Sequence, residues 1–289
     1  MLFQDNSPAP EVFVAPFSTA GGKVTIGKPV NISKNSGYDN QPAFTPDGAA
    51  VLFTSVRGDR KPAPANSAQT GSDIYRYDLT SHSLSQVTAT SESEYSPTVM
   101  PDGQHLSVVQ VEPDDTQRLW RFPLAGGKPD VILRDVKPVG YHAWADARTV
   151  ALFVLGDPPT LQLADVSTGK ADVIASDIGR SILRIPGGGI SFVHRETIDG
   201  QRALVVKELD PATKQVRPLV RVISGVNAPD LAWTPDGMLL LAAHGKLHGW
   251  RRAAQTFEVV ADLESIGLRG VSRMAVSPAG DRLALVAQP

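Results

Sequence analysis

A short pattern built around a Pro-Asp-Gly turn recurs along this chain of 289 residues, and it constrains the fold more than any other feature. Each copy has an apolar or aromatic anchor, then the turn, then an apolar run. Clear copies lie at 41–48, 96–103, 230–237 and 274–280, where Ala replaces Asp in the last, and weaker copies lie at 143–146 and 183–187. The copies are about 46 residues apart, a period typical of four-stranded propeller blades and of some helical repeats.

The turn chemistry selects the propeller over the helical repeat. Pro presets φ at the first central position of a turn, and Gly accepts a positive φ. Short β-rich runs lie on both sides of each turn and predict a hairpin, whereas no stretch shows a helical period with caps. The second half of each repeat predicts another hairpin, for example residues 73–79 with 84–88. Each repeat therefore predicts four strands.

The two ends of the chain complement each other. Residues 11–33 match the second half of a repeat, and residues 272–287 match the first half. Joined together they complete a sixth blade and remove two exposed sheet edges. The sequence predicts an all-β fold, a six-bladed β-propeller with four antiparallel strands per blade and a last blade closed by N- and C-terminal strands. The single domain spans 1–289, with the other blades at 39–90, 94–136, 139–178, 180–222 and 228–262.

Charge and composition exclude several classes of protein. With 28 Lys and Arg against 30 Asp and Glu, the formal charge is −2, which lacks the basic excess of a general nucleic-acid binder. There is no cysteine, so disulfides and thiolate metal sites are excluded. We find no apolar run of about 18 residues and expect no membrane span. No signal peptide is visible at the start of the sequence, and we expect a monomer.

The repeats resemble those of the TolB-like propellers, which carry the same aromatic-Ser/Thr-Pro-Asp-Gly signature, over about residues 11 to 287. The run from Phe53 to Asp59, followed by Asp73, Ile74 and Tyr75, is especially similar to a TolB-type passage between the second and third strands. An insertion at 61–72 interrupts this passage, and TolB's additional N-terminal domain has no counterpart here. The resemblance implies a bacterial protein that is periplasmic or secreted. It leaves function open, because such repeats occur in scaffolds, receptor-like modules and occasional enzymes.

Polar residues at the start of the first strand of each repeat predict a binding site. In a propeller these positions gather around one mouth of the central channel, and we call them the mouth residues: Gln41, Ser96, Tyr141, Arg180, Asp230 and Arg273. Arg180 and Arg273 beside Asp230 suit a carboxylate or a peptide terminus. The expected ligand-binding set is Asp39, Gln41, Arg57, Tyr95, Tyr141, Arg180, Asp230 and Arg273. The alternative is that these are solvated strand ends that pair locally.

Three histidines define a second hypothesis. His194 and His244 occupy matched positions at the ends of second strands, and His142 begins a neighbouring first strand. Together they could ligate a divalent metal. A few metal-dependent polysaccharide lyases that resemble this fold place histidines in the channel, although their local pattern is not reproduced here. The alternative function is thus a metal-dependent lyase or hydrolase acting on an acidic saccharide, and isolated histidines at strand ends are the simpler explanation.

No other motif points to catalysis. The sequence has no Gly-x-Ser-x-Gly elbow, and Asp47, Asp102 and Asp236 are better explained as repeated turn residues than as catalytic carboxylates. We therefore interpret the chain as a non-catalytic propeller, without a cofactor, that binds a protein, peptide or small ligand on its funnel face.

Overall fold

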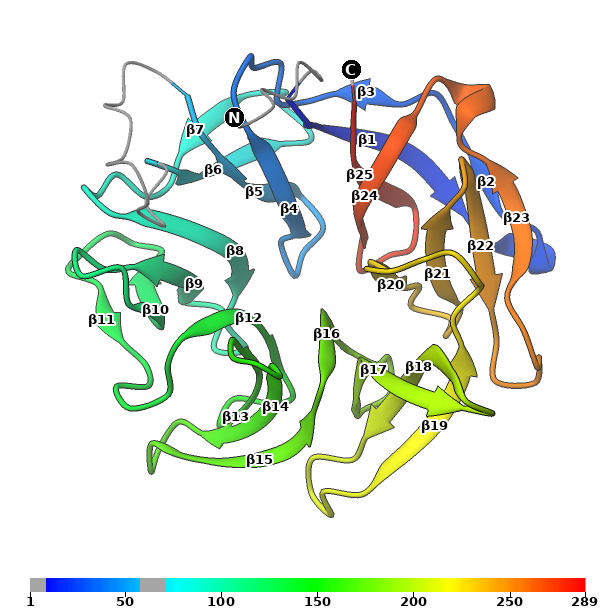
Figure 1. Cartoon of the computed structure of the whole chain (residues 1–289). Helices are drawn as coiled ribbons and strands as arrows, with labels where there is room; N and C mark the ends of the chain where they lie inside the picture. The colour runs from blue at the N-terminus through cyan, green and yellow to red at the C-terminus, as the bar shows by residue number, and fades with distance from the viewer. Residues whose placement is uncertain (1–8, 58–70, 289) are drawn as a thin grey trace, which may run out of the picture.

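The computed structural model describes residues 9–57 and 71–288, and these residues form six β-sheets arranged around a ring (Figure 1). The insertion expected at 61–72 therefore lies outside the described residues except for Gly71 and Ser72. Besides the strands, the described residues include two 3-10 helices, η1 (Ala20–Gly22) and η2 (Glu264–Ile266). The predicted six-bladed, all-β propeller is confirmed.

Five blades are continuous in sequence, with four antiparallel strands each. Blade 1 contains β4 (Asp39–Phe44), β5 (Ala50–Ser55), β6 (Asp73–Asp78) and β7 (Leu84–Gln86), and blade 2 contains β8 (Ser93–Val99), β9 (His105–Val111), β10 (Gln117–Pro123) and β11 (Asp130–Val131). Blade 3 contains β12 (Val139–Trp144), β13 (Thr149–Val154), β14 (Thr160–Asp165) and β15 (Lys170–Ser176), and blade 4 contains β16 (Ile178–Arg184), β17 (Ile190–Ile198), β18 (Gln201–Leu209) and β19 (Val216–Arg221). Blade 5 contains β20 (Leu231–Trp233), β21 (Leu239–Ala243), β22 (Lys246–Trp250) and β23 (Glu258–Asp262).

The closing blade combines both ends of the chain, as predicted. Its strands are β24 (Arg269–Val276) and β25 (Arg282–Gln288), with β1 (Glu11–Ser18), β2 (Thr25–Ile26) and β3 (Val30–Asn31). β1 pairs with β25 in an unbroken register that runs from Glu11 opposite Ala287 to Pro16 opposite Arg282. The blue and red strands lie side by side in Figure 1. This ladder converts an open row of blades into a ring.

The core lies between the faces of neighbouring blades. Second strands pack on both faces, and every residue of β5 is buried. The two tryptophan anchors add hydrogen bonds across blade boundaries: Trp144 Nε1 donates to Ser107 Oγ at 2.9 Å, and Trp233 Nε1 donates to Ser191 Oγ at 2.8 Å. Each indole thus contributes apolar area and satisfies its N–H inside the core.

The Pro-Asp-Gly segments are turns, as their composition indicates. In the first copy, the Asp47 carboxylate accepts hydrogen bonds from Thr45 Oγ1 at 2.6 Å and from the Ala49 N–H at 3.0 Å. Gly48 adopts φ +70°, a left-handed conformation that favours glycine. These hydrogen bonds lower the pKa of Asp47 and give the aspartate a structural role.

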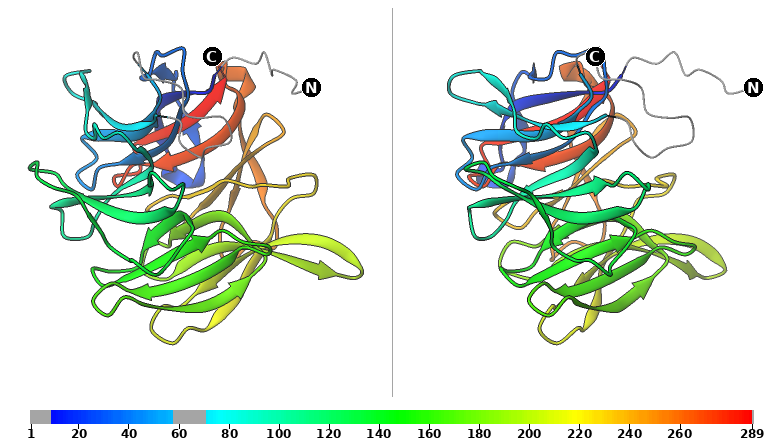
Figure 2. Two further views of the ribbon diagram at one scale, coloured as in Figure 1. Left: turned by 60° about the vertical axis from the view of Figure 1, so that its left-hand side comes forward. Right: turned by 90° about the vertical axis from the view of Figure 1, so that its left-hand side faces the viewer.

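One hairpin is longer than the others. β17 and β18 have nine residues each, and their paired ends project from one face of the ring (Figure 2). No helix among the described residues is long and apolar enough to cross a membrane.

Candidate functional site

A central channel with a volume of about 930 Å³ runs along the ring axis. It extends from the mouth residues to Pro235 and Pro278, which belong to turns on the opposite face. All six mouth residues line it: Gln41, Ser96, Tyr141, Arg180, Asp230 and Arg273. The fold therefore brings together the six residues that the repeat alignment placed at equivalent positions. They include Arg180, which belongs to the most degenerate repeat.

The innermost strands are irregular near the mouth. In five of the blades the pairing between the first and second strands shifts register there, as it does between Asn40 and Ala43 and between Tyr95 and Thr98. Such bulges redirect side chains and are common beside binding sites. Gln41 and Ser96 sit at two of them with φ of 57° and 54°. A proline follows each of these two residues, Pro42 and Pro97, and strands accommodate proline at bulges, a signal that the sequence analysis did not use.

A hydrogen bond across blades fixes one side of the mouth. The side-chain oxygen of Gln41 accepts from the Ser96 N–H and from Thr54 Oγ1, both at 2.9 Å. The Ser96 hydroxyl oxygen is buried and has no hydrogen-bond partner among the described residues. This part of the lining therefore holds Gln41 rigidly and leaves one hydroxyl unsatisfied.

An arginine pair dominates the other side of the mouth. Asp230 Oδ2 accepts from Arg180 Nη2 at 3.0 Å and also from Arg273 Nη1. Arg273 is nearly buried, with 11% of its side chain exposed, whereas Arg180 is 36% exposed. Burial raises the pKa of Asp230, and the two guanidinium groups oppose that rise. One carboxylate thus faces two cations, and Arg180 reaches solvent.

Two tyrosines extend this charged group. Tyr141 Oη accepts from Arg273 Nη2 at 3.0 Å, and its ring lies 5.6 Å from the same guanidinium. Tyr38 lies just before β4, and burial raises its pKa to about 12. The nearby Tyr141 also raises this pKa, whereas Arg273 and Arg180 lower it. The sequence analysis did not select Tyr38, because it lies three residues before Gln41 and outside the aligned positions.

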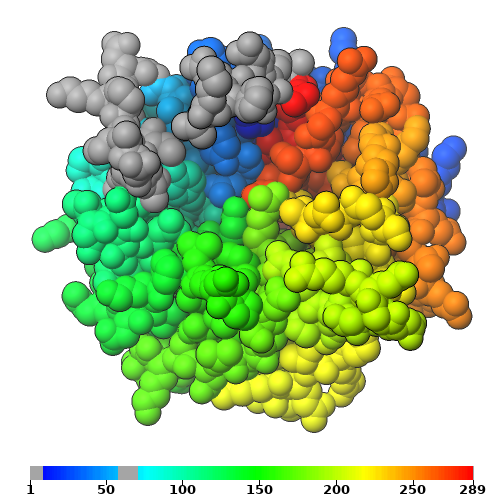
Figure 3. All heavy atoms as spheres, viewed as in Figure 1, coloured from blue at the N-terminus to red at the C-terminus, as the bar shows by residue number. Residues whose placement is uncertain are grey.

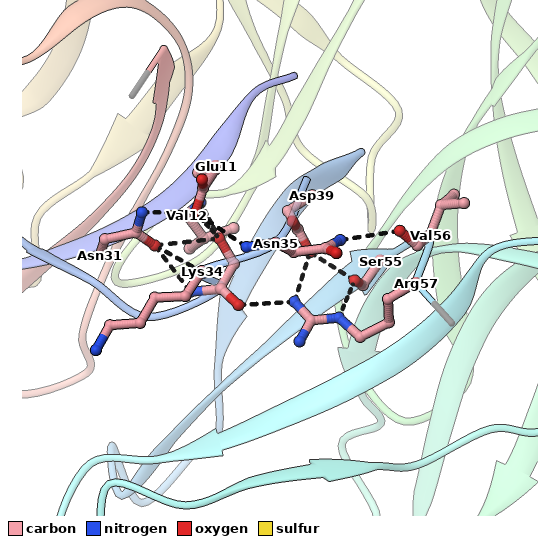
Figure 4. A network of polar contacts seen from close by, with 10 residues as sticks. Glu11, Val12, Asn31, Lys34, Asn35, Asp39, Ser55, Val56 and Arg57 are labelled. Carbon is pink, nitrogen blue, oxygen red and sulfur yellow. Dashed lines mark hydrogen bonds and ion pairs between the residues drawn. The ribbon is translucent and has the colours of Figure 1, made fainter. Parts of the chain in front are cut away.

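Two of the predicted binding residues hold the ring together instead of lining the channel. Arg57 donates from Nη2 to Asp39 Oδ1 at 3.1 Å and to the Ser33 carbonyl at 2.9 Å, and from Nε to Ser55 Oγ at 2.7 Å (Figure 4). Its guanidinium also lies 4.9 Å from the Tyr75 ring centroid. Asp39 is fully buried, and desolvation raises its pKa. The contacts tie blade 1 to the segment that follows β3.

The remaining predicted residues are spread over different surroundings. Tyr95 packs against the core between blades 2 and 3 and is not among the channel-lining residues. His142 lines the channel, but its Nε2 is 2.7 Å from Ser107 Oγ inside the core. His194 Nδ1 lies 3.0 Å from Glu196 Oε1, and His244 Nε2 lies 3.3 Å from the Ser224 carbonyl.

This arrangement of the histidines does not suit a metal ion. Burial lowers the pKa of His142 to about 4 and keeps its imidazole neutral, as a metal ligand must be, but its Nε2 is already engaged by Ser107 Oγ in the core. Within residues 9–57 and 71–288, no three His, Asp or Glu side chains are grouped closely enough to hold a metal. The described residues thus do not fit a three-histidine centre. Whether the protein binds a metal is a prediction that direct metal analysis can test.

A buried acid between blades 1 and 2 also escaped the sequence analysis. Glu94 is fully buried and accepts from Thr88 Oγ1 and Gln110 Nε2, both at 3.0 Å, and from Thr90 Oγ1. Burial, together with the nearby Asp73, raises its pKa to about 7 despite these hydrogen bonds. Glu94 is two residues before Ser96, so the acid lies close to the mouth in sequence without lining the channel.

Comparison with known proteins identifies the architecture. No family model matches the chain, and no curated protein matches it. A protein assigned as TolB from Agrobacterium tumefaciens superposes with a TM-score of 0.68 at 15% identity, covering 96% of this chain and 98% of that one. TolB from Acinetobacter baumannii gives 0.61 at 15% identity over 98% of this chain and 65% of its own.

An enzyme shares the same architecture. An oligogalacturonate lyase in complex with manganese gives a TM-score of 0.62 at 15% identity, covering 94% of this chain and 85% of that one. Likenesses at this level of identity concern the fold, and the fold hosts both TolB and a lyase.

Proposed function

Starting from a six-bladed propeller with the TolB-like fold, we propose that this chain is a non-catalytic scaffold whose channel mouth binds a carboxylate-bearing protein or peptide segment. The observation that carries the proposal is the convergence of Arg180 and Arg273 on the single carboxylate of Asp230. A periplasmic or secreted location, inferred from the resemblance, is part of the proposal and is testable by cell fractionation.

The charge balance of the channel supports an anionic ligand. Three arginines, Arg180, Arg184 and Arg273, line the channel with one acidic residue, Asp230. Arg180 uses Nε and Nη2 on Asp230, while its Nη1 has no partner among the described residues. A guanidinium with a free edge and partial exposure binds a carboxylate with directed hydrogen bonds.

The shape of the site supports a segment of chain more than a small ion. The channel volume of about 930 Å³ lies near the upper end of the range found for ligand pockets. Apolar residues, including Leu183, Ala232 and Met274, line the channel together with the polar ones. A peptide end that places its carboxylate at Arg180 would bury side chains against that wall.

A peptide library displayed with free C-terminal carboxylates tests the proposal. The library is panned against the wild-type protein and against Arg180→Gln, with Arg148→Gln as the matched control. Arg148 is exposed, pairs with Asp165 at 3.0 Å and does not line the channel. We expect peptides enriched on the wild type and on Arg148→Gln to bind Arg180→Gln about tenfold more weakly or worse. Equal enrichment on Arg180→Gln would refute the proposed site.

The competing function, a metal-dependent lyase or hydrolase acting on an acidic saccharide, rests on the shared fold with the manganese-bound lyase. Metal analysis of untagged protein separates the two functions. Stoichiometric manganese that is lost in His194→Ala would favour the lyase. A protein purified without metal that gains none on titration with manganese would favour the scaffold.

A further inference from the structure

A second pocket, of about 490 Å³, lies between the projecting β17–β18 hairpin and residues 222–227. It shares no lining residue with the central channel. The hairpin and this loop, yellow-green and yellow, lie next to each other on the face shown in Figure 3. We call it the hairpin pocket. It belongs to blade 4 and is separate from the site proposed above.

The lining of the hairpin pocket is basic. Arg195, Arg202 and Arg221 line it, and no acidic residue does. Arg195 is partly neutralised, because its Nη1 lies 3.2 Å from Asp177 Oδ1 and also donates to the Ile178 carbonyl at 2.6 Å. Arg202 and Arg221 are exposed and form no ion pair with any described residue. The pocket therefore carries two uncompensated positive charges.

The same pocket contains an open strand edge. β19 pairs with β18 only from Val205, which lies opposite Arg221, to Leu209. Residues Gln201 to Leu204 of β18 continue past the end of β19 toward the hairpin tip. Exposed edges of this kind pair readily with another chain.

The turn between β17 and β18 determines which backbone N–H and C=O groups of β18 are not paired with β17. Ile198 lies opposite Gln201, and the two residues between them, Asp199 and Gly200, have φ of 52° and 75°, as in a two-residue type I′ turn. Such a turn makes Ile198 and Gln201 a hydrogen-bonded pair, so the N–H and C=O of Arg202 point away from β17.

A hydrogen bond further along β18 agrees with this register. Two residues further along β18, the Leu204 carbonyl accepts from the Val222 N–H at 2.8 Å on the outer side. The main chain of Arg202 therefore faces the position that a further residue of β19 would occupy. Three apolar residues, Leu204, Val222 and Val226, also line the pocket.

We propose that the hairpin pocket binds an extended acidic peptide segment, which adds to β18 as a strand at Arg202. The main chain of Arg202 supplies hydrogen bonds to the peptide backbone, as in other cases of strand addition. Successive side chains of an extended peptide point to opposite faces. Arg221 lies opposite Val205 and therefore shares the face of that residue, whereas Arg202 and Leu204 point to the other face. Neighbouring acidic residues of the peptide therefore meet Arg221 on one face and Arg202 on the other, and an apolar residue packs beside Leu204. The charge of the pocket selects an acidic segment, and the open edge selects an extended one.

The test uses a short, fluorescently labelled peptide of repeated Glu-Glu-Val-Val, which presents glutamates on both faces of the strand, with a peptide of repeated Gln-Gln-Val-Val as the neutral probe. Binding is followed by fluorescence anisotropy. We expect the Glu-containing peptide to bind the wild type, and the double variant Arg202→Gln/Arg221→Gln to bind it at least about tenfold more weakly. Arg217→Gln is the matched control, because Arg217 is an exposed β19 residue outside the pocket and should leave binding unchanged.

A second comparison separates strand pairing from charge attraction. Arg202→Pro removes the same charge as Arg202→Gln and also the outward N–H, and edge positions tolerate proline. Proline should therefore weaken binding more than glutamine does. Hydrogen–deuterium exchange on the wild type gives an independent readout, with slower exchange of the Arg202 amide when peptide is bound.

Several results would overturn the proposal. Equal affinity for the Gln-containing peptide would exclude charge selection, and equal loss in Arg202→Gln and Arg202→Pro without amide protection would reduce the pocket to a simple anion site. Loss of peptide binding in Arg180→Gln, which leaves the hairpin pocket intact, would place the peptide in the channel instead. Retained binding in Arg180→Gln supports two separate sites.

Discussion

Trp233 of blade 5 donates its indole N–H to the hydroxyl of Ser191 in blade 4 at 2.8 Å, across the boundary between the two blades. Both side chains are buried, and the Trp144–Ser107 pair repeats the contact between blades 3 and 2. The tryptophan anchors of the repeat thus couple one blade to the blade before it.

Replacing the acceptor should therefore weaken the ring. Ser191→Ala leaves the Trp233 N–H buried without a partner, and we expect a loss of about 1–3 kcal/mol in the free energy of unfolding. Urea denaturation measures this loss. Ser85→Ala, at an exposed position on β7, is the control and should change stability by less than about 0.5 kcal/mol. A neutral Ser191→Ala would show that the indole finds another partner.

Glu94 should make stability fall as pH rises. Its pKa is about 7 in the folded protein against an ordinary value of 4.5, so the folded state binds the proton more tightly. The stabilisation from protonated Glu94 is full below pH 4.5 and is lost as pH rises through about 7. Melting temperatures of wild type and Glu94→Gln across this range test the effect, and the variant should show a flatter profile. Glu258→Gln, on exposed β23, should follow the wild type.

The acidic residue at the channel mouth should set affinity for anions. Asp230→Asn preserves the shape of the side chain but removes the charge that offsets Arg180 and Arg273. We expect peptides selected for a free carboxylate to bind this variant severalfold more tightly, while stability falls by about 1–3 kcal/mol. Calorimetric titration and denaturation measure the two effects. Weaker binding would mean that Asp230 positions the arginines, and the exposed Asp135→Asn serves as control.

The turn aspartates should affect folding and leave binding unchanged. Asp102 accepts from the backbone N–H groups of Gln104 and His105 at 2.8 and 3.1 Å, and these bonds contribute to its lowered pKa. Asp102→Ala should cost about 1 kcal/mol in unfolding free energy, because a turn loses its side-chain acceptor. Affinity for peptides at the mouth should remain at the wild-type value. A marked loss of affinity would assign these aspartates a part in ligand binding.

The repeat pattern predicted the features that follow from equivalent positions in successive blades. Side chains alternate along a strand, so aligned anchors such as Phe44 and Trp233 also align the positions before them, and all six mouth residues reach the channel. The pairing of the chain ends followed from the same logic, because each half-blade lacks its partner strands.

Features that depend on contacts between distant repeats were beyond the pattern. Arg57 was placed in the ligand-binding set, and its contact with the Ser33 carbonyl, in the segment between β3 and β4, is one that the repeat alignment does not record. Tyr38 and Glu94 acquire their raised pKa values from burial between blades, which a local pattern does not record. The bulges at Gln41 and Ser96 shift single residues, and the prolines that follow them, Pro42 and Pro97, are a local signal that the sequence analysis did not use.

The pairing of β1 with β25 has a consequence for synthesis in the cell. Glu11 lies opposite Ala287, so the first strand leaves the ribosome long before its partner has been translated. Until β25 is made, β1 can pair with β2 and β3 but its other edge stays open, and an open apolar edge is prone to aggregate. Ring closure is thus a late, long-range folding event. The closing blade therefore cannot complete its sheet until β25 has been translated.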